Sequence, residues 1–374
     1  MSKLEELIQQ YCPDGVEYVK LGDIEDQGYI KLGRGNVISK QDMKDCPGDF
    51  PVYSSSSVGD GEIGRYGKYM FDDERISWSI DGGGKFFYRN NLRYSITNVS
   101  GWLKVLAPKV VSTKYLYYTL MNEWVKKVYD YTHKAHPSVI REEYIIPIPP
   151  LPVQEEIVRI LDTFTELQAE LQAELQKRLQ QYNYYRDNLL SFEGRTDVEW
   201  KKLGEISKVC RGVRVVKSQL SNEGYPVYQN CLTPMGYYDK TNCPAGTPFV
   251  ICGGAAGNVG YADVDWWAAD DCEYIIGNAG LTNRYIYHCL MAKKDYLLSQ
   301  VRKASIPRLS PNVIKDLEIP VPPLAEQQRI VDILDRFDSL TNDLTAGLPA
   351  EIEKRKQQYE YYRDRLLTFK RKEA

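Results

Sequence analysis

The chain has 374 residues, of which 43% are hydrophobic and 26% are charged, and its formal net charge at pH 7 is -3. This length allows two domains with separate cores, and the nearly neutral charge argues against a protein that binds polyanions through overall charge alone. The chain has neither an apolar run of about 20 residues nor a signal-peptide pattern, so we expect a cytoplasmic protein without membrane contact.

The first part of the chain, residues 1–150, is expected to form a domain that contains short strands and tight turns. Short apolar runs such as Pro51–Tyr53 are separated by Gly, Asn and Asp, which is typical of strands and turns. The segment Lys114–Leu120 is expected to be helical, as is its counterpart Arg284–Leu290 in the second half. Because strands and helices do not alternate regularly, an α+β fold with a mixed or antiparallel sheet is favoured over a doubly wound one.

A long amphipathic helix is predicted over residues 151–193, directly after the prolines of Pro149–Leu151. Its apolar positions from Ile157 to Phe192 recur every 3.5 residues on average, which is the period of a coiled coil. The tetrapeptide Leu-Gln-Ala-Glu occurs twice in tandem at 167–174. From Gln154 to Phe192, at ~1.5 Å per residue, this helix is about 58 Å long, enough to act as a spacer.

The remainder repeats this arrangement, with a second domain predicted over 194–323 and a second helical region over 324–374. The matching segments are 16–24 with 198–206, 51–53 with 226–228, 114–120 with 284–290, 149–151 with 322–324, and 182–192 with 359–369. A duplication of this size predicts two similar domains related by an approximate internal twofold axis and joined by two long antiparallel helices.

The second helical region is expected to be broken near Gly347–Pro349. Tyr359 follows Phe337 by 22 positions, whereas in the first helix Tyr182 follows Phe164 by 18 positions. The extra segment contains a glycine and a proline, which suit the end of one helix and the first turn of the next.

Several catalytic and metal-binding patterns are absent from the sequence. Gly82–Phe86 lacks the first glycine and the final hydroxyl residue of a phosphate loop, and Gly253–Gly260 lacks dinucleotide-binding spacing. His133 and His136 are close in sequence, but the third histidine lies in the other half. The eight cysteines contain no C-x-x-C pair, so we expect reduced thiols and no metal site. We therefore expect a chain that is not an enzyme by itself.

The loops that differ between the two halves carry basic and amide side chains, which can pair with phosphates and base edges of DNA. Each also has the simpler interpretation of a solvated surface residue. Segment 194–324 is net basic, with 15 Lys and Arg against 13 Asp and Glu. The candidate DNA-binding residues are Arg34, Asn36, Lys40, Arg89, Asn91, Arg93 and Lys134 in the first half, and Arg211, Arg214, Lys217, Asn230, Arg302, Lys303 and Arg308 in the second.

The repeated helices carry a specific signature. Pro-Pro-Leu is followed by Gln, Ile-Val and Leu-Asp-x-Phe, and then by Tyr-x-Tyr-Tyr-Arg-Asp-x-Leu-Leu-x-Phe. Its occurrence twice around two variable domains closely resembles the specificity subunit of type I restriction-modification systems. The signature residues expected to form the helix framework or subunit contacts are Gln154, Ile157, Leu161, Tyr182, Tyr185 and Arg186, and Gln327, Ile330, Leu334, Tyr359, Tyr362 and Arg363.

The resemblance implies a non-catalytic subunit that reads a bipartite asymmetric sequence in double-stranded DNA, one half-site per target-recognition domain. It implies that the helices set the spacer and bind two modification subunits that methylate adenine at N6. Restriction subunits that hydrolyse ATP, translocate and cleave DNA are further implied partners. S-adenosylmethionine, ATP and Mg²⁺ are expected on those partners, and no cofactor is expected on this chain.

Two other function classes remain open at this point. One is a dimeric scaffold whose coiled coil organises proteins other than methyltransferases. The other is a specificity module that works with a fused methyltransferase-nuclease.

Overall fold

The structure is a computed structural model of the chain. It describes residues 2–55, 59–130, 132–342 and 347–372.

The chain divides into two compact units, and the long helices are shared between them. One unit consists of Met1–Glu170 together with Glu353–Ala374, and the other of Leu171–Ile352. Each unit therefore combines one globular domain with segments of the helical regions from both halves of the sequence.

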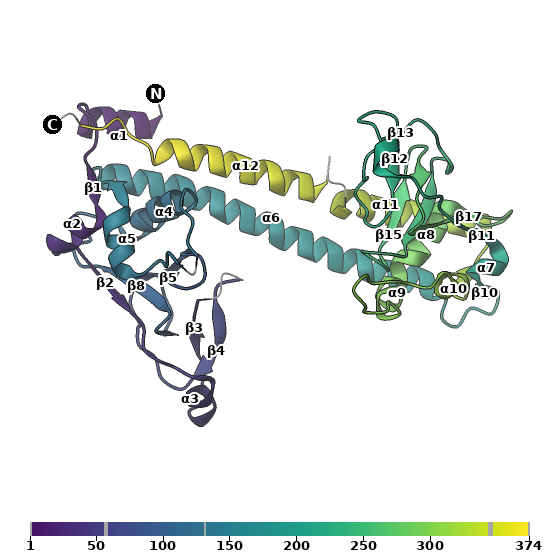
Figure 1. Cartoon of the computed structure of the whole chain (residues 1–374), viewed down its shortest axis with the longest axis horizontal. Coiled ribbons are helices and arrows are strands. Elements are labelled where there is room, and N and C mark those ends of the chain that lie inside the picture. Colours follow the sequence, from purple (N-terminus) through teal and green to yellow (C-terminus); the bar gives the residue numbers. More distant parts are fainter. Residues whose placement is uncertain (1, 56–58, 131, 343–346, 373–374) are drawn as a thin grey trace. The chain divides into compact units, whose positions relative to one another are not determined.

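The globular part of the first unit contains short strands and short helices (Figure 1). Its strands are β1 Tyr18–Lys20, β2 Ile30–Arg34, β3 Phe50–Tyr53, β4 Glu62–Tyr66, β5 Arg75–Ser79, β6 Phe86–Arg89, β7 Ser95–Ile96, β8 Ser100–Val105 and β9 Ile145–Pro147. Its helices are α1 Lys3–Tyr11, α2 Leu21–Asp26, α3 Lys40–Asp45, α4 Thr113–Trp124 and α5 Pro137–Glu143.

These strands form three small sheets. The main sheet has the order β2-β8-β5-β6, and all its pairs are antiparallel. A second sheet has the order β4-β3-β7, in which β3 and β7 are parallel. The third pairs β1 with β9. The mixed and antiparallel pairing predicted from the sequence is confirmed.

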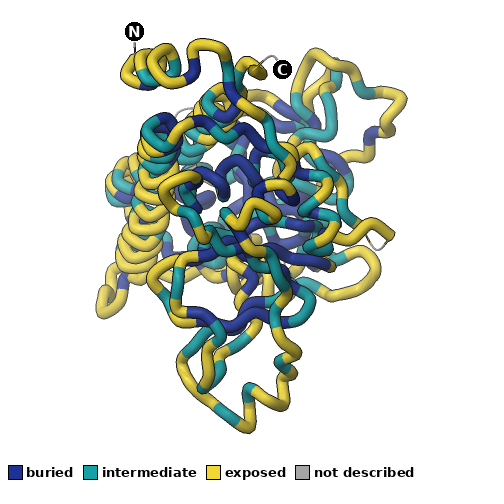
Figure 2. The backbone as a smooth tube through the Cα atoms, turned by 90° about the vertical axis from the view of Figure 1, so that its left-hand side faces the viewer, coloured by how far each residue is buried: buried dark blue, intermediate teal, exposed yellow. Residues whose placement is uncertain are grey.

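The core of this domain lies between the main sheet and its helices. Ile76, Leu103 and Leu116 are fully buried there, and α4 is the helix predicted around Lys114. Buried Trp78 donates from its indole nitrogen to the carbonyl oxygen of Ala135 at 2.7 Å, so burial leaves its polar group satisfied. Figure 2 shows buried segments inside the molecule, whereas the N-terminal helix is mostly exposed.

The second unit repeats this topology. Its strands are β10 Glu199–Lys202, β11 Ser207–Arg211, β12 Tyr225–Tyr228, β13 Tyr237–Tyr238, β14 Thr247–Ile251, β15 Val259–Ala262, β16 Trp267–Ala268, β17 Cys272–Gly277 and β18 Glu318–Val321. Its short helices are α7 Leu203–Ile206, η1 Lys217–Gln219, α8 Asn283–Ala292, α9 Lys294–Ser299 and α10 Pro311–Lys315. The sheets have the orders β11-β17-β14-β15, β13-β12-β16 and β10-β18, and β12 and β16 are parallel. The predicted duplication of the α+β domain is confirmed.

Three helices connect the globular parts. Helix α6 spans Leu151–Ser191 without interruption, through the tandem tetrapeptide. Helix α11 spans Leu324–Asn342, and α12 spans Leu348–Leu366. The break predicted near Gly347–Pro349 adjoins residues 343–346, which lie outside the described residues; Pro349 occupies the first turn of α12.

A buried glutamine fixes the first turn of α6 to its domain. The Gln154 amide nitrogen donates to the carbonyl oxygens of Val110 and Pro149 at 2.9 and 2.7 Å. Its amide oxygen accepts from the backbone N–H of Ser112 at 2.9 Å. Gln154 is fully buried, so these three bonds satisfy backbone groups at the N-terminal ends of both α4 and α6.

Gln327 makes the equivalent three hydrogen bonds in the second unit. Its amide nitrogen donates to the carbonyl oxygens of Gly280 and Pro322 at 2.7 and 2.9 Å, and its oxygen accepts from Thr282 N–H at 3.0 Å. The equal spacing of the two glutamines after Pro-Pro-Leu in the two repeats thus has a structural cause.

Aromatic stacking shows which helix segments lie together inside each unit. In the first unit Phe164 of α6 stacks on Tyr362 of α12, with ring centroids 5.5 Å apart. In the second unit Phe337 of α11 stacks on Tyr185 of α6 at 5.3 Å. Within each unit, the start of one repeat's helix therefore packs on the tyrosine signature of the other repeat, as an antiparallel pair requires.

The three hydrogen bonds of Gln327 predict that its replacement destabilises the protein far more than replacement of its neighbour Gln328 in α11. Gln327→Ala leaves one buried N–H and two buried carbonyls without partners, so we expect the free energy of unfolding to fall by about 2–3 kcal/mol. Gln328 is exposed, and among the described residues its side chain bonds to Asp332 alone, so Gln328→Ala serves as the control and should cost under ~0.5 kcal/mol. Urea unfolding of both variants measures the loss in free energy of unfolding. Equal losses for the two variants would contradict the stabilising role of the Gln327 bonds.

Candidate nucleic-acid interface

In the first domain, β2 ends at an arginine that is tied to a neighbouring turn. Arg34 donates from Nε and Nη2 to the carbonyl oxygen of Asn98 at 3.1 and 2.7 Å, while its side chain remains exposed. Gly35 follows, where an added Cβ would lie 2.3 Å from the Ile96 carbonyl oxygen. The chain then continues beside β7, with Asn36 N–H bonded to the same carbonyl at 3.2 Å. The bonds to Asn98 and the tight packing of Gly35 against Ile96 together hold the Arg34 guanidinium in one orientation.

The other candidate residues of the first domain are spread over several loops. Lys40 is the exposed first residue of α3, which is capped by Ser39. Asn91 is exposed at a turn with φ 57°. The exposed Arg93 guanidinium lies 5.0 Å from the Tyr69 ring centroid. Exposed Lys134 pairs with Asp81 at 3.0 Å.

Arg89 lies in the interior of the domain. It is 5% exposed, and its guanidinium stacks 3.5 Å from the Tyr53 ring centroid. Nε donates to Ser77 Oγ at 3.2 Å, and Nη2 bonds to the Asp60 carbonyl oxygen. A DNA contact would require Arg89 to leave these partners, so its contacts here are structural.

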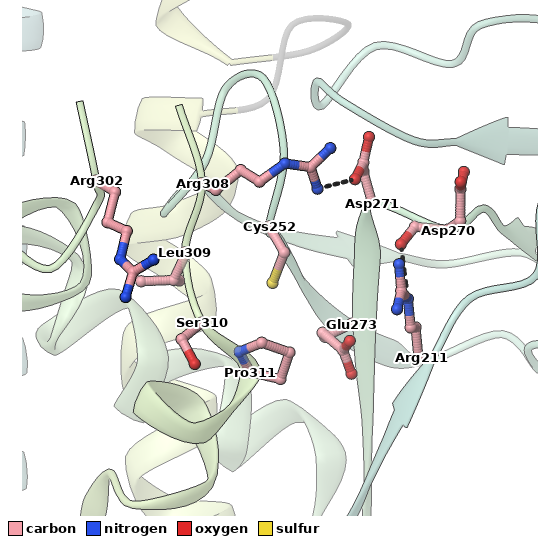
Figure 3. A pocket seen from close by; sticks show the side chains of 10 residues that line it. All are labelled: Arg211, Cys252, Asp270, Asp271, Glu273, Arg302, Arg308, Leu309, Ser310 and Pro311. Carbon is pink, nitrogen blue, oxygen red and sulfur yellow. Dashed lines mark hydrogen bonds and ion pairs between the residues drawn. The ribbon is translucent and has the colours of Figure 1, made fainter. Parts of the chain in front are cut away.

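The second domain brings three of its candidate residues around one cavity of about 300 Å³. Figure 3 shows Arg302 and Arg308 on the wall formed by the segment before α10, and Arg211 on the opposite wall beside Asp270 and Glu273. Arg308 pairs with Asp271 at 3.0 Å, and Arg211 Nε donates to the Asp270 carbonyl oxygen at 3.1 Å. Both signs of charge therefore line this cavity.

Glu273 is the buried acid of this cavity. It is 4% exposed, and burial raises the pKa of its carboxyl although Arg211 and Lys315 act in the opposite direction. The thiol of Cys252 borders the same cavity, and burial raises its pKa to about 12, so it stays a neutral thiol. All eight cysteines are free, and five of them are buried.

Several candidate cations of the second domain have no side-chain bond to other described residues. Arg214, Arg302 and Lys303 are exposed, as is Lys217 in η1. The candidate amide Asn230 is also exposed, and its backbone carbonyl oxygen accepts from Ala255 N–H at 2.9 Å. Solvated cations of this kind can neutralise phosphates at little desolvation cost.

The helix signature residues divide into framework and surface positions. The framework is buried and comprises Gln154, Ile157, Leu161, Tyr182, Gln327, Ile330 and Leu334. Tyr359 is half-buried, and Arg363 donates to Asn122 at 3.1 Å. Arg186 lies beside Asp187 at 2.8 Å. Tyr185 and Tyr362 are 45% and 44% exposed, so their outer faces remain available.

Glu273 and the acidic turn at Asp270–Asp271 were not predicted from the sequence, because carboxylates there have no signal that separates them from solvated surface acids. The equivalence of Arg34 with Arg211 was not predicted either, although both are followed by glycine. Among the described residues, no group of three or more His, Cys, Asp or Glu side chains could hold a metal ion. No described helix has the length and apolar character of a membrane span.

Comparisons with known proteins identify the family. A family model for the type I restriction modification DNA specificity domain matches residues 13–181 and again residues 196–354. The specificity subunit of the Escherichia coli type I restriction enzyme EcoR124I/EcoR124II is 36% identical over 296 residues, which cover 70% of this chain and 72% of that protein. A Mycoplasma pneumoniae protein assigned as a type I specificity subunit is 30% identical over 361 residues, covering 93% and 96%.

The fold agrees with these sequence matches. The crystal structure of a type I restriction-modification S subunit from M. genitalium superposes with a TM-score of 0.69 at 17% identity, covering 94% of this chain and 96% of that one. The chain belongs to the family of type I restriction-modification specificity subunits and contains two copies of its DNA specificity domain.

Proposed function

We propose that this chain selects the DNA sequence for a type I restriction-modification complex, with each globular domain reading one half of a bipartite, asymmetric site. The observation that carries the proposal is the combination of a repeated framework with differing surface residues. Gln154 and Gln327 make the same three bonds, whereas the matching surface positions Asn36 and Val213 differ. Two equally built domains with different surfaces suit two different half-sites.

The helices have two roles in this proposal. The uninterrupted 41-residue helix α6 belongs to both compact units, so its length sets the separation of the half-sites. The half-exposed Tyr185 and Tyr362, with exposed Tyr184 and Tyr361 beside them, offer aromatic surfaces on which two modification subunits dock.

The chemistry belongs to the partners. Each modification subunit binds S-adenosylmethionine and methylates an adenine that is flipped out of the duplex. The restriction subunits use ATP and Mg²⁺. This chain contributes recognition and spacing and is not catalytic by itself.

The spacer role is tested by lengthening α6. Insertion of one further Leu-Gln-Ala-Glu unit after Glu174 adds ~6 Å and, at 3.6 residues per turn, about 40° of extra rotation. We expect the preferred spacer to lengthen by one or two base pairs while both half-sites stay the same, as read by methylation of a library of spacer lengths.

The control for this insertion is Gln172→Ala, which alters the same segment without changing its length. It should keep the parent spacer. If the insertion also kept the parent spacer while still methylating, α6 would not set the separation.

A second test concerns the solvated cations Arg302 and Lys303. Replacing both with Ala should weaken DNA binding and flatten the dependence of affinity on salt, because fewer counterions are released on binding. Fluorescence anisotropy at several salt concentrations measures this. The control is Lys201→Ala, since Lys201 already pairs with Glu199 at 2.6 Å. If the double variant matched the affinity of the parent at every salt concentration, Arg302 and Lys303 would not be contacts to DNA.

A further inference from the structure

Arg34 and Arg211 occupy the same place in the two domains. In the main sheets, Arg34 of β2 lies opposite Gly101 of β8, and Arg211 of β11 lies opposite Glu273 of β17. Each arginine donates to the carbonyl oxygen of the residue three positions before that partner, in a turn that precedes β8 or β17.

The glycine after each arginine is also equivalent. Gly35 N–H donates to the Ser100 carbonyl oxygen at 3.0 Å, and Gly212 N–H donates to that of Cys272 at 2.9 Å. An added Cβ at Gly212 would lie 2.0 Å from the Ala269 carbonyl oxygen, so this site is as tight as that of Gly35. The Arg-Gly pair therefore holds an exposed guanidinium in one orientation in both domains.

The residues around this arginine have diverged. The position opposite it is Gly101 in one domain and Glu273 in the other, and the residue after the glycine is Asn36 or Val213. Base edges differ between half-sites, whereas phosphates are the same everywhere on a duplex. A cation that is retained, and that a bonded turn also holds in one orientation, while its neighbours change, fits the phosphate backbone.

We propose that Arg34 and Arg211 are equivalent contacts to the DNA phosphate backbone, one in each domain, which supply affinity without sequence preference. This inference rests on the proposed function. Nε, and in Arg34 also Nη2, is bonded to the turn, and Nη1 of each guanidinium has no bond to other described residues. The remaining N–H groups can donate to a phosphate while the turn keeps the side chain in place.

The test uses Arg34→Ala and Arg211→Ala in the full chain, with salt-dependent affinity measured on a duplex that carries both half-sites and on one with both scrambled. Each variant should reduce the slope of log affinity against log salt by about 1 on both duplexes. The ratio of the two affinities should stay at the parent value.

The chain offers a matched control in Lys31 and Lys208, which lie three residues before the arginines on the same strands and are exposed. These lysines are also retained in both domains, but among the described residues no turn holds them, and side chains three residues apart on a strand point to opposite faces of the sheet. Lys31→Ala and Lys208→Ala therefore remove the same charge and should leave the slope unchanged.

The variants Arg34→Lys and Arg211→Lys distinguish a phosphate contact from a purely structural role of the arginines. Lysine keeps the charge and binds phosphate, but it lacks the planar fork that holds the turn. We expect the lysine variants to keep the parent slope. Lysine variants that lose as much slope as the alanine variants, together with a lowered melting temperature, would overturn the proposal, as would alanine variants that change the affinity ratio. A parent chain that binds both duplexes equally would instead refute the proposed function and leave the slope comparison intact.

Discussion

The buried glutamine at the start of each long helix is the contact on which the rest of the architecture depends. Gln154 and Gln327 each join three backbone groups that burial would otherwise leave unsatisfied, and they do so where a globular domain meets its helix. A side-chain amide is suited to this place because it both donates and accepts without carrying charge. The domain surfaces can then change sequence while the attachment of domain to helix stays constant.

The fold was largely predictable from the sequence because the signal was repeated. The helix signature, the α+β class and the helices at Lys114–Leu120 and Arg284–Leu290 follow from local patterns, and the structure has them. Helix α1 was not predicted, although Ser2 and Glu5 form its capping box. The stacking of Phe164 on Tyr362 was also not predictable, because it joins residues far apart in sequence.

The candidate interface was predictable only in outline. Residue type selects basic and amide side chains, but it cannot tell Arg89, buried against Tyr53, from Arg34, which is exposed at a strand end. That distinction depends on strand pairing, as does the meeting of Arg211 with Glu273 across β11 and β17. Repeated cations among diverged neighbours become visible only after the two domains are compared bond by bond.

We propose that the two domains of this one chain specify the two halves of one DNA site, and mapping N6-methyladenine across the genome with and without the gene tests this proposal. We expect one bipartite asymmetric motif, with a fixed unread spacer, to lose its methylation when the gene is removed. A methylome that is unchanged, or a lost motif without two separated halves, would contradict it.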